Sequence, residues 1–453
     1  MEEFAAVGKS LPLYASLPSL AAFALVLVVV LRKTPSRAGR FVFFAIWLRL
    51  ALSAYHEVTF DPSPAGLSWN ALGSVAIASL GLFVIRWRRL GDIALLPFYP
   101  VLFIMIGSGF VNGEAGPMMT ALTKFAYLIV LTLATVDALE DLGASRLFGR
   151  LLWAFAFPVW LQFLSIVLGV VKPGEVDGAD SYIGGFNHEG GFSVALAGGL
   201  LVACFTGLRL RFRIGLIVLG IVGILLANYR TAVLAILPLV GVAILIGVTR
   251  RFVPSQRGLV AGVMALAVAG ALGIGVIAGQ ERFADLGTAF TAGGDLIKPP
   301  GDYSTEDKEV LSGRPRIWSW YIYGWAEGSE TQKVIGFGPE SWVDVFPLYA
   351  HNTLVSTLYE TGVVGVAALL LLWGWFLTLA LRARGWPRLE LAAAHLSFFV
   401  FNMATMPMWL IEGMIFYGLA CGLSVFCFQH RTRPHPVRAL NHTASLSEPN
   451  ALA

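Results

Sequence analysis

The chain has 453 residues, of which 57% are hydrophobic and 13% are charged, and its mean hydropathy is +0.73. Soluble domains carry about 25% charged residues, so this composition excludes a water-soluble fold and indicates an all-α polytopic membrane protein. The net charge of +4 does not indicate a nucleic-acid-binding protein, because no basic tract lies outside the short loops. All three cysteines lie in apolar runs, which argues against a disulfide framework or a cysteine-bound metal.

Membrane spans are predicted from apolar runs bounded by charged residues or by Gly and Pro, which gives about 12–13 transmembrane helices. Glu2 and Glu3 precede the first run and Arg32 and Lys33 follow it, the reverse of a signal peptide, so this run is expected to stay as an anchor with its N-terminus outside. The predicted spans are 11–31, 40–56, 67–85, 93–111, 118–136, 151–171, 186–207, 214–227, 231–248, 258–279, 351–381, 389–405 and 409–428.

The distribution of Lys and Arg predicts the orientation, because cytoplasmic loops are enriched in these residues. With alternate loops taken as cytoplasmic, 21 of the 32 basic residues lie inside, 9 lie outside and 2 lie within spans. The expected organisation is therefore ten transmembrane helices in 1–279, a long periplasmic loop in 280–350 with short amphipathic helices, three transmembrane helices in 351–428 and a disordered cytoplasmic tail in 429–453. Structureless loops longer than about 12–15 residues are uncommon unless they are functional, so the activity is expected at the outer face.

Three cations are predicted at or near the outer ends of spans. Arg49 and Lys124 lie inside predicted spans, and Arg230 starts another. A buried cation is costly in a bilayer, so these residues indicate a shared pocket for phosphate. The alternative is that Arg49 and Lys124 extend to the interface or pair with Glu57 or Glu114.

The long loop adds two arginines and a row of aromatic residues. Arg314 and Arg316 offer planar guanidinium groups suited to phosphate. On a helix Trp318, Tyr321 and Trp325 form one stripe, which indicates an interfacial helix or a platform for sugar rings.

Two histidines at the outer face are candidates for acid–base chemistry. Gly336-Phe337-Gly338 indicates a turn. His351 opens the next predicted span, and an imidazole at this boundary between water and membrane is well placed to act as a base. His188 follows a glycine-rich turn, and its neighbour Glu189 could orient it or bind a sugar hydroxyl. The polar residues inside later spans could merely bridge helices: Glu360, His395 and Glu412.

The ordered set of these motifs resembles the bacterial O-antigen ligase and O-antigen or exopolysaccharide polymerase superfamily of integral membrane glycosyltransferases. The resemblance covers about 184–366, with the outer glycine-rich turn and the Arg230 segment as earlier landmarks. The motifs that carry it are Ser312-Gly313-Arg314, Ile317-Trp318, Gly336-Phe337-Gly338, His351-Asn352-x-Leu354 and Glu360-x-Gly362-x-x-Gly365.

The resemblance implies an enzyme of the bacterial inner membrane that needs neither metal nor another cofactor and whose active site faces the periplasm. It implies an undecaprenyl-diphosphate-linked glycan as donor and an acceptor glycan, either a repeat unit or lipid A core, with other polysaccharide-export proteins as further partners. The resemblance implies that His351 is the catalytic base and that Arg230 and Arg314 bind diphosphate. Their residue types and positions lead us to expect Arg316, Arg49 and Lys124 at the diphosphate as well. The residues expected to contact glycan or acceptor are His188, Glu189, Asn352, Trp318 and Tyr321.

Four functions remain open from the sequence, one of which is a non-catalytic scaffold in a polysaccharide-export assembly. The turn at 186–189 favours a polymerase of exopolysaccharide or surface-polysaccharide repeat units, and transfer of O-antigen to lipid A core is the alternative within the family. A single base without a covalent carboxylate predicts inversion at the anomeric carbon. From another class, a transporter or flippase would use Arg49 and Lys124 to bind an anionic substrate in transit.

Overall fold

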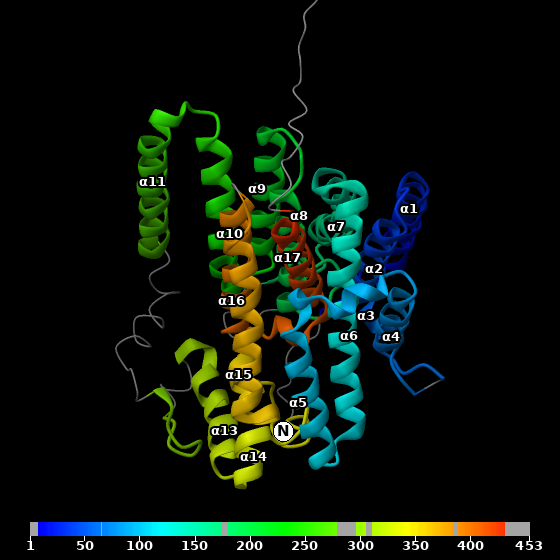
Figure 1. Cartoon of the computed structure of the whole chain (residues 1–453), viewed down its shortest axis with the longest axis vertical. Coiled ribbons are helices and arrows are strands. Elements are labelled where there is room, and N and C mark those ends of the chain that lie inside the picture. Colours follow the sequence, from blue (N-terminus) through cyan, green and yellow to red (C-terminus); the bar gives the residue numbers. More distant parts are fainter. Residues whose placement is uncertain are drawn as a thin grey trace, which may run out of the picture.

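The computed structural model describes residues 8–64, 66–173, 180–278, 296–304, 310–384 and 387–430 (Figure 1). Over these residues the fold is all α-helical, and the β-type pairing consists of isolated bridges such as Lys172 with Ser181. The expected disordered tail, from 431 onward, lies outside the described residues, as do 279–295 and 305–309 of the long loop. The prediction of an all-α membrane protein is confirmed.

Each of the thirteen predicted spans contains one long helix, because each apolar run satisfies its backbone hydrogen bonds internally. Six of them are long and apolar enough to cross a membrane: α1, α6, α7, α10, α15 and α17. The long helices are α1 (Leu13–Lys33), α2 (Arg37–Ala54), α4 (Trp69–Leu82), α5 (Phe98–Val111), α6 (Ala115–Leu142), α7 (Ala144–Val167), α8 (Glu189–Cys204), α9 (Leu210–Leu226), α10 (Arg230–Thr249), α11 (Arg257–Ala278), α15 (Thr353–Leu381), α16 (Pro387–Asn402) and α17 (Ile411–Gln429).

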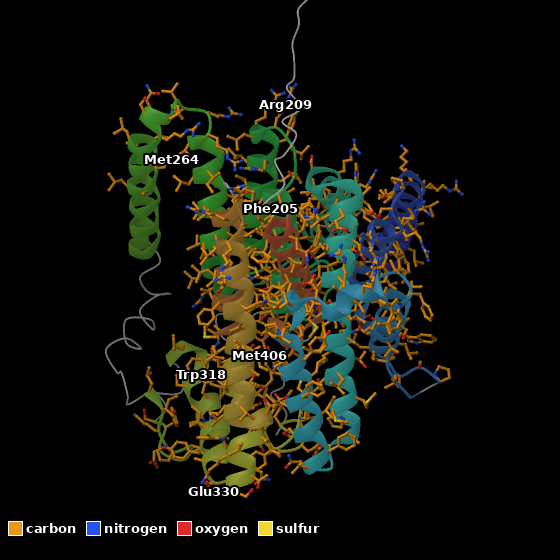
Figure 2. All side chains as sticks on the ribbon, viewed as in Figure 1. Phe205, Arg209, Met264, Trp318, Glu330 and Met406 are labelled. Atoms are coloured by element: carbon orange, nitrogen blue, oxygen red, sulfur yellow. The ribbon has the colours of Figure 1, made fainter. Side chains whose placement is uncertain are left out.

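Shorter helices fill the connections on one side of the bundle. They are α3 (His56–Thr59), α13 (Arg314–Ala326) and α14 (Glu330–Ile335). Figure 1 shows α13 and α14 at one end of the molecule, and Figure 2 shows Glu330 at that end and Arg209 at the other. The loop with short helices and the basic α8–α9 turn therefore lie at opposite ends of the bundle, as the charge distribution predicts.

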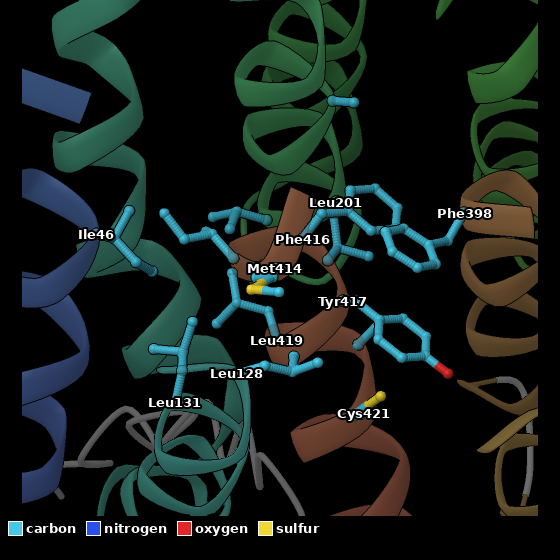
Figure 3. Packing of buried hydrophobic residues seen from close by; sticks show 14 of the residues in the cluster. Ile46, Leu128, Leu131, Leu201, Phe398, Met414, Phe416, Tyr417, Leu419 and Cys421 are labelled. Carbon is cyan, nitrogen blue, oxygen red and sulfur yellow. The ribbon is translucent and has the colours of Figure 1, made fainter. Parts of the chain in front are cut away.

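The bundle is centred on α17, which packs most extensively against α6 (Figure 3). Small residues allow this close approach, since a β-carbon at Gly422 would lie 2.7 Å from the Thr135 β-carbon and 2.8 Å from the Thr132 carbonyl oxygen. Around this contact Ile46 of α2, Leu201 of α8 and Phe398 of α16 complete one apolar core. The core holds the ends of α2, α8 and α15 in fixed positions relative to α17.

The short helices dock on α15 through a kink in that helix. Gly362 interrupts the helix with φ of +67°, so the carbonyl groups of Tyr359 and Glu360 accept hydrogen bonds from Phe337 and Gly338, each at 2.9 Å. A β-carbon at Gly336 would lie 2.2 Å from the carbonyl carbon of Glu360. The predicted turn at 336–338 is thus a close crossing of two backbones, which explains why both segments carry glycine.

Candidate functional site

His351 is fixed at the start of α15 by the residue that follows it. Asn352 accepts hydrogen bonds from the backbone of Leu354 at 2.9 Å and Val355 at 3.3 Å, and its amide donates to the Met403 carbonyl at 3.2 Å. These bonds cap the helix and tie it to the end of α16. His351 has φ of +53°, a conformation that L-residues rarely adopt and that occurs preferentially at functional sites. Asn352, expected to contact glycan, is therefore the cap that positions His351.

The surroundings of His351 keep its imidazole neutral. Burial lowers its pKa from 6.5 to about 3, and the nearby charges of Arg314 and His188 act in the same direction. Its Nδ1 is buried without a hydrogen-bond partner, which leaves Nε2 as the nitrogen that can meet a substrate. The ring lies 3.9 Å from that of Tyr349, measured between centroids. A neutral imidazole has an unprotonated nitrogen that can accept a proton.

Arg314 and Arg230 lie where α13 and α10 begin. Arg314 donates from Nη2 to the hydroxyl of Thr231 at 3.3 Å, and Arg230 is the neighbour of Thr231 on α10. Burial raises the pKa of the Tyr229 hydroxyl, the charge of Arg314 lowers it and the charge of Glu189 raises it. Glu189 is the first residue of α8, so the start of α8 lies near Tyr229. Helix N-termini favour anions, so the starts of α8, α10, α13 and α15 mark a region suited to a negatively charged group.

Three further loop residues predicted at the site lie on α13. The Arg316 guanidinium lies 5.3 Å from the ring centroid of Trp320, and its Nε is buried without a partner, as is Nε1 of Trp318. The Trp318 side chain is half-buried. In Figure 2 Trp318 and Met406 are at a similar height in the molecule. Tyr321 differs from the expectation of a sugar platform, because it is fully buried and its hydroxyl donates to the Leu348 carbonyl at 2.9 Å. It packs on Phe346 and Tyr359, so it offers no ring face to a glycan.

His188 and Glu189 are linked to a lysine that the sequence did not single out. Lys172 is buried, with 2% of its side chain exposed, and donates to Glu189 at 2.6 Å. The other oxygen of Glu189 lies 3.6 Å from Nε2 of His188. The backbone of Gly190 donates to Nδ1 of His188 at 3.0 Å, which leaves Nε2 as the ring nitrogen that faces Glu189. Glu189 thus lies beside His188, and its role in orienting this ring stays a prediction.

Arg49 and Lys124 line one cavity of about 380 Å³, although their partners are not the predicted ones. Arg49 donates from Nε to Glu412 at 2.9 Å and also to Asn70, and Lys124 pairs with Glu340. The predicted partners Glu57 and Glu114 are therefore replaced by carboxylates that only the tertiary fold brings close. The other polar or charged lining residues include His188, Glu340, Glu360 and Glu412, and the aromatic ones are Phe60, Phe186, Trp342, Tyr349 and Trp409.

The polar residues inside late spans do bridge helices, as the sequence allowed. Glu412 joins α17 to Arg49 of α2, and His395 contacts Ser424 through Nε2 at 2.8 Å. Glu360 accepts a hydrogen bond from the backbone of Glu340 at 2.7 Å and so holds the loop beside the cavity. Within the described ranges, no group of three or more His, Cys, Asp or Glu residues is arranged to hold a metal ion.

A comparison with curated proteins gives no significant match. Residues 215–370 match the family described as O-antigen ligase, about a third of the chain. The matched segment contains seven of the predicted site residues: Arg230, Arg314, Arg316, Trp318, Tyr321, His351 and Asn352. This family comprises membrane glycosyltransferase-like enzymes that act on lipid-linked glycans and acceptors. The match over residues 215–370 supports the assignment of this multi-pass membrane protein to the O-antigen ligase and polymerase superfamily.

Proposed function

We propose that the protein transfers a glycan from undecaprenyl diphosphate to a sugar hydroxyl of an acceptor at the periplasmic face of the bacterial inner membrane. The observation that carries the proposal is the electrostatic effect of Arg314 on His351. Arg314 contacts the start of α10 through Thr231 at 3.3 Å, and its charge contributes to the low pKa of the His351 imidazole. Both residues lie in the segment that matches the family. A cation and a base at one place are what displacement of a diphosphate by a hydroxyl requires.

The reaction is a single in-line displacement. His351 accepts the proton of the acceptor hydroxyl through Nε2, and the hydroxyl oxygen bonds to the anomeric carbon of the donor glycan. The bond from that carbon to the diphosphate oxygen breaks, and its electron pair leaves with the diphosphate. Arg314 and Arg230 stabilise the negative charge that develops there, helped by the helix N-termini. One displacement inverts the anomeric centre, and neither a metal nor another cofactor enters this scheme.

The distribution of basic residues supports the periplasmic assignment of this site. Arg314 begins α13, and His351 follows α14 in the chain. Figure 1 shows α13 and α14 at one end of the bundle, and Figure 2 shows Arg209 of the basic α8–α9 turn at the other. Since basic turns are enriched on the cytoplasmic side, the site faces outward. Lipid-linked glycans of this kind present the diphosphate at the membrane surface, and in this proposal α13, which packs against α15, lies at that surface.

The acceptor in this proposal is another repeat unit, so the product is a polymer of surface polysaccharide or exopolysaccharide. The turn at 186–189 supports this choice over transfer of O-antigen to lipid A core, which is the alternative within the family. A transporter loses its main support, since Arg49 and Lys124 each have a carboxylate partner. Arg230 and Arg314, at the starts of α10 and α13, are the cations that we assign to the diphosphate site.

Purified protein in nanodiscs, given lipid-linked glycan from the producing strain, tests the proposal. We expect longer glycans and free undecaprenyl diphosphate, with inversion at the new linkage by NMR, in the presence of a chelator. Glycan profiles of a deletion strain then separate the two acceptors. Loss of long chains with single units retained on core supports a polymerase, whereas loss of all core-attached glycan supports a ligase. No product from purified protein with intact substrate contradicts glycosyl transfer.

A further inference from the structure

In the cavity lined by Arg49 and Lys124, the positive charges are balanced by carboxylates. Of the described residues that line it, the two cations Arg49 and Lys124 are each paired with a carboxylate, Glu412 and Glu340, and a third carboxyl group belongs to Glu360. A diphosphate in this cavity would meet at least as many carboxyl groups as cations. Like charges at short range repel, so the cavity is a poor site for an anion although two cations line it.

The rest of the wall is suited to sugar rings. Trp342, Tyr349 and Trp409 line the cavity, and Trp342 and Tyr349 meet edge to face with centroids 6.3 Å apart. The volume of about 380 Å³ falls within the range of about 300–1,000 Å³ that is usual for small-molecule sites. Aromatic faces pack against the C–H faces of a sugar, and the paired charges of Lys124 and Glu340 offer donors and acceptors to its hydroxyls.

The position of the cavity connects it to the proposed base. Tyr349 lines the cavity, and its ring lies 3.9 Å from that of His351. His188 also lines the cavity, and its charge acts on His351. Arg314 is not among the lining residues and contacts Thr231 of α10 instead. His351 therefore lies between the charge-compensated cavity and the arginines of α10 and α13.

We propose that this cavity binds the acceptor, as a hydroxyl-rich sugar residue that carries no phosphate, with Trp342, Lys124 and Glu340 as its specificity-determining residues. The acceptor hydroxyl reaches His351 from the cavity, while the donor diphosphate is held outside it by Arg230 and Arg314. Arg49 and Lys124 are thereby assigned to the acceptor rather than to the diphosphate. This inference rests on the proposed glycosyl transfer and adds the place and the chemical class of the acceptor.

The test uses a probe that can occupy only an acceptor site. Free repeat-unit oligosaccharide, released from the surface polysaccharide of the producing strain, has neither lipid nor diphosphate, and its binding to the full-length protein in nanodiscs is measured by calorimetry. Glu340→Gln and Trp342→Ala are the cavity variants. Glu330→Gln is the matched control, because Glu330 forms a 2.9 Å ion pair with Lys333 on exposed α14, outside the cavity. Arg314→Lys reports on the diphosphate site.

We expect both cavity variants to bind the oligosaccharide about 10- to 100-fold more weakly, the effect of losing a hydrogen bond to a charged group or a ring contact. Glu330→Gln and Arg314→Lys should keep the wild-type dissociation constant, although Arg314→Lys loses transfer. Unchanged binding in monodisperse cavity variants, or no saturable binding to wild type at millimolar concentration, overturns the acceptor site. Wild type that binds the oligosaccharide but never transfers glycan contradicts the proposed function alone.

Discussion

The imidazole of His351 is held neutral by burial and by the guanidinium of Arg314. Burial is the main cause that lowers the pKa of His351 to about 3, and the charges of Arg314 and His188 add to it. The same arginine that is proposed to bind the leaving group therefore keeps the proposed base free of a proton. When a diphosphate binds, its negative charge offsets the guanidinium and makes the imidazole a stronger proton acceptor. Substrate binding and activation of the base are coupled by this relationship.

This coupling predicts an unusual pH profile. Because the folded-state pKa of His351 lies below the ordinary 6.5, the base stays unprotonated in the free enzyme as the pH falls from 8 to about 5. The acidic limb of kcat/KM should therefore lie well below pH 6.5, measured with purified protein and lipid-linked glycan. The unfolded chain binds more protons at this residue between about pH 3 and 6.5, so its contribution makes the fold less stable as the pH falls through that window. A limb at the ordinary histidine value would contradict the buried, cation-adjacent state of His351.

The diphosphate site predicts that charge alone cannot replace Arg314. A guanidinium binds two phosphate oxygens in a fixed planar arrangement, whereas an ammonium is a point charge. We expect Arg314→Ala to lower the turnover of lipid-linked glycan about 10²- to 10³-fold, and Arg314→Lys to lose at least about tenfold. Quantified glycan length in a complemented deletion strain is the measurement. Normal length in both variants would make Arg314 a surface anchor.

The crossing of two backbones at Gly336 and Gly362 predicts a sharp effect on stability. Gly336 has φ of +78°, and an added β-carbon would lie 2.2 Å from Glu360, so Gly336→Ala should destabilise the fold by more than about 2 kcal/mol. Gly374→Ala, on the helix α15 that Gly336 crosses, is the control, since a β-carbon at Gly374 would meet no atom within 4 Å. Thermal unfolding followed by size-exclusion chromatography in detergent should show a lowered Tm for Gly336→Ala alone. Equal Tm values would mean that the loop is not docked on the kinked helix.

The orientation of the chain can be tested by labelling. After replacement of Cys204, Cys421 and Cys427, single cysteines are placed at exposed Ser304 and at Ser445 in the tail. An impermeant maleimide on intact cells should label only the cysteine at 304, because the basic turns mark the opposite face as cytoplasmic. Labelling at 445 would reverse the orientation and move the reaction to the other compartment.

The sequence predicts the helices well because hydropathy alone determines where a chain can cross a bilayer, and every predicted span contains a helix. It also places His351, Arg314 and Arg230 near one another through their order in a motif set. It does not predict that Arg49 pairs with Glu412, which lies 363 positions away, or that Lys172 holds Glu189. Those pairs depend on which helix faces meet, and periodicity carries no such information.

The aromatic stripe on α13 shows a second limit. Spacing places Trp318, Tyr321 and Trp325 on one face, and the structure turns Tyr321 of that face into the core formed with Phe346 and Tyr359. An amphipathic stripe has the same sequence pattern whether it packs against a lipid surface, a sugar or the rest of the protein. In this structure the partner is the rest of the protein, because α13 packs against α15 and Tyr321 contacts Tyr359 of that helix.

The central claim is that His351 is the base, and one pair of variants tests it most directly. Removing a positioned base lowers the rate about 10²- to 10⁴-fold, whereas a capped helix start retains its fold without the imidazole. His351→Ala should insert and accumulate like wild type, keep oligosaccharide binding in the cavity and yet fail to transfer glycan from purified lipid-linked donor. His188→Ala, the other histidine at the site, should keep measurable turnover. Near-normal transfer by His351→Ala together with an inactive His188→Ala would contradict the account and assign the base to the start of α8.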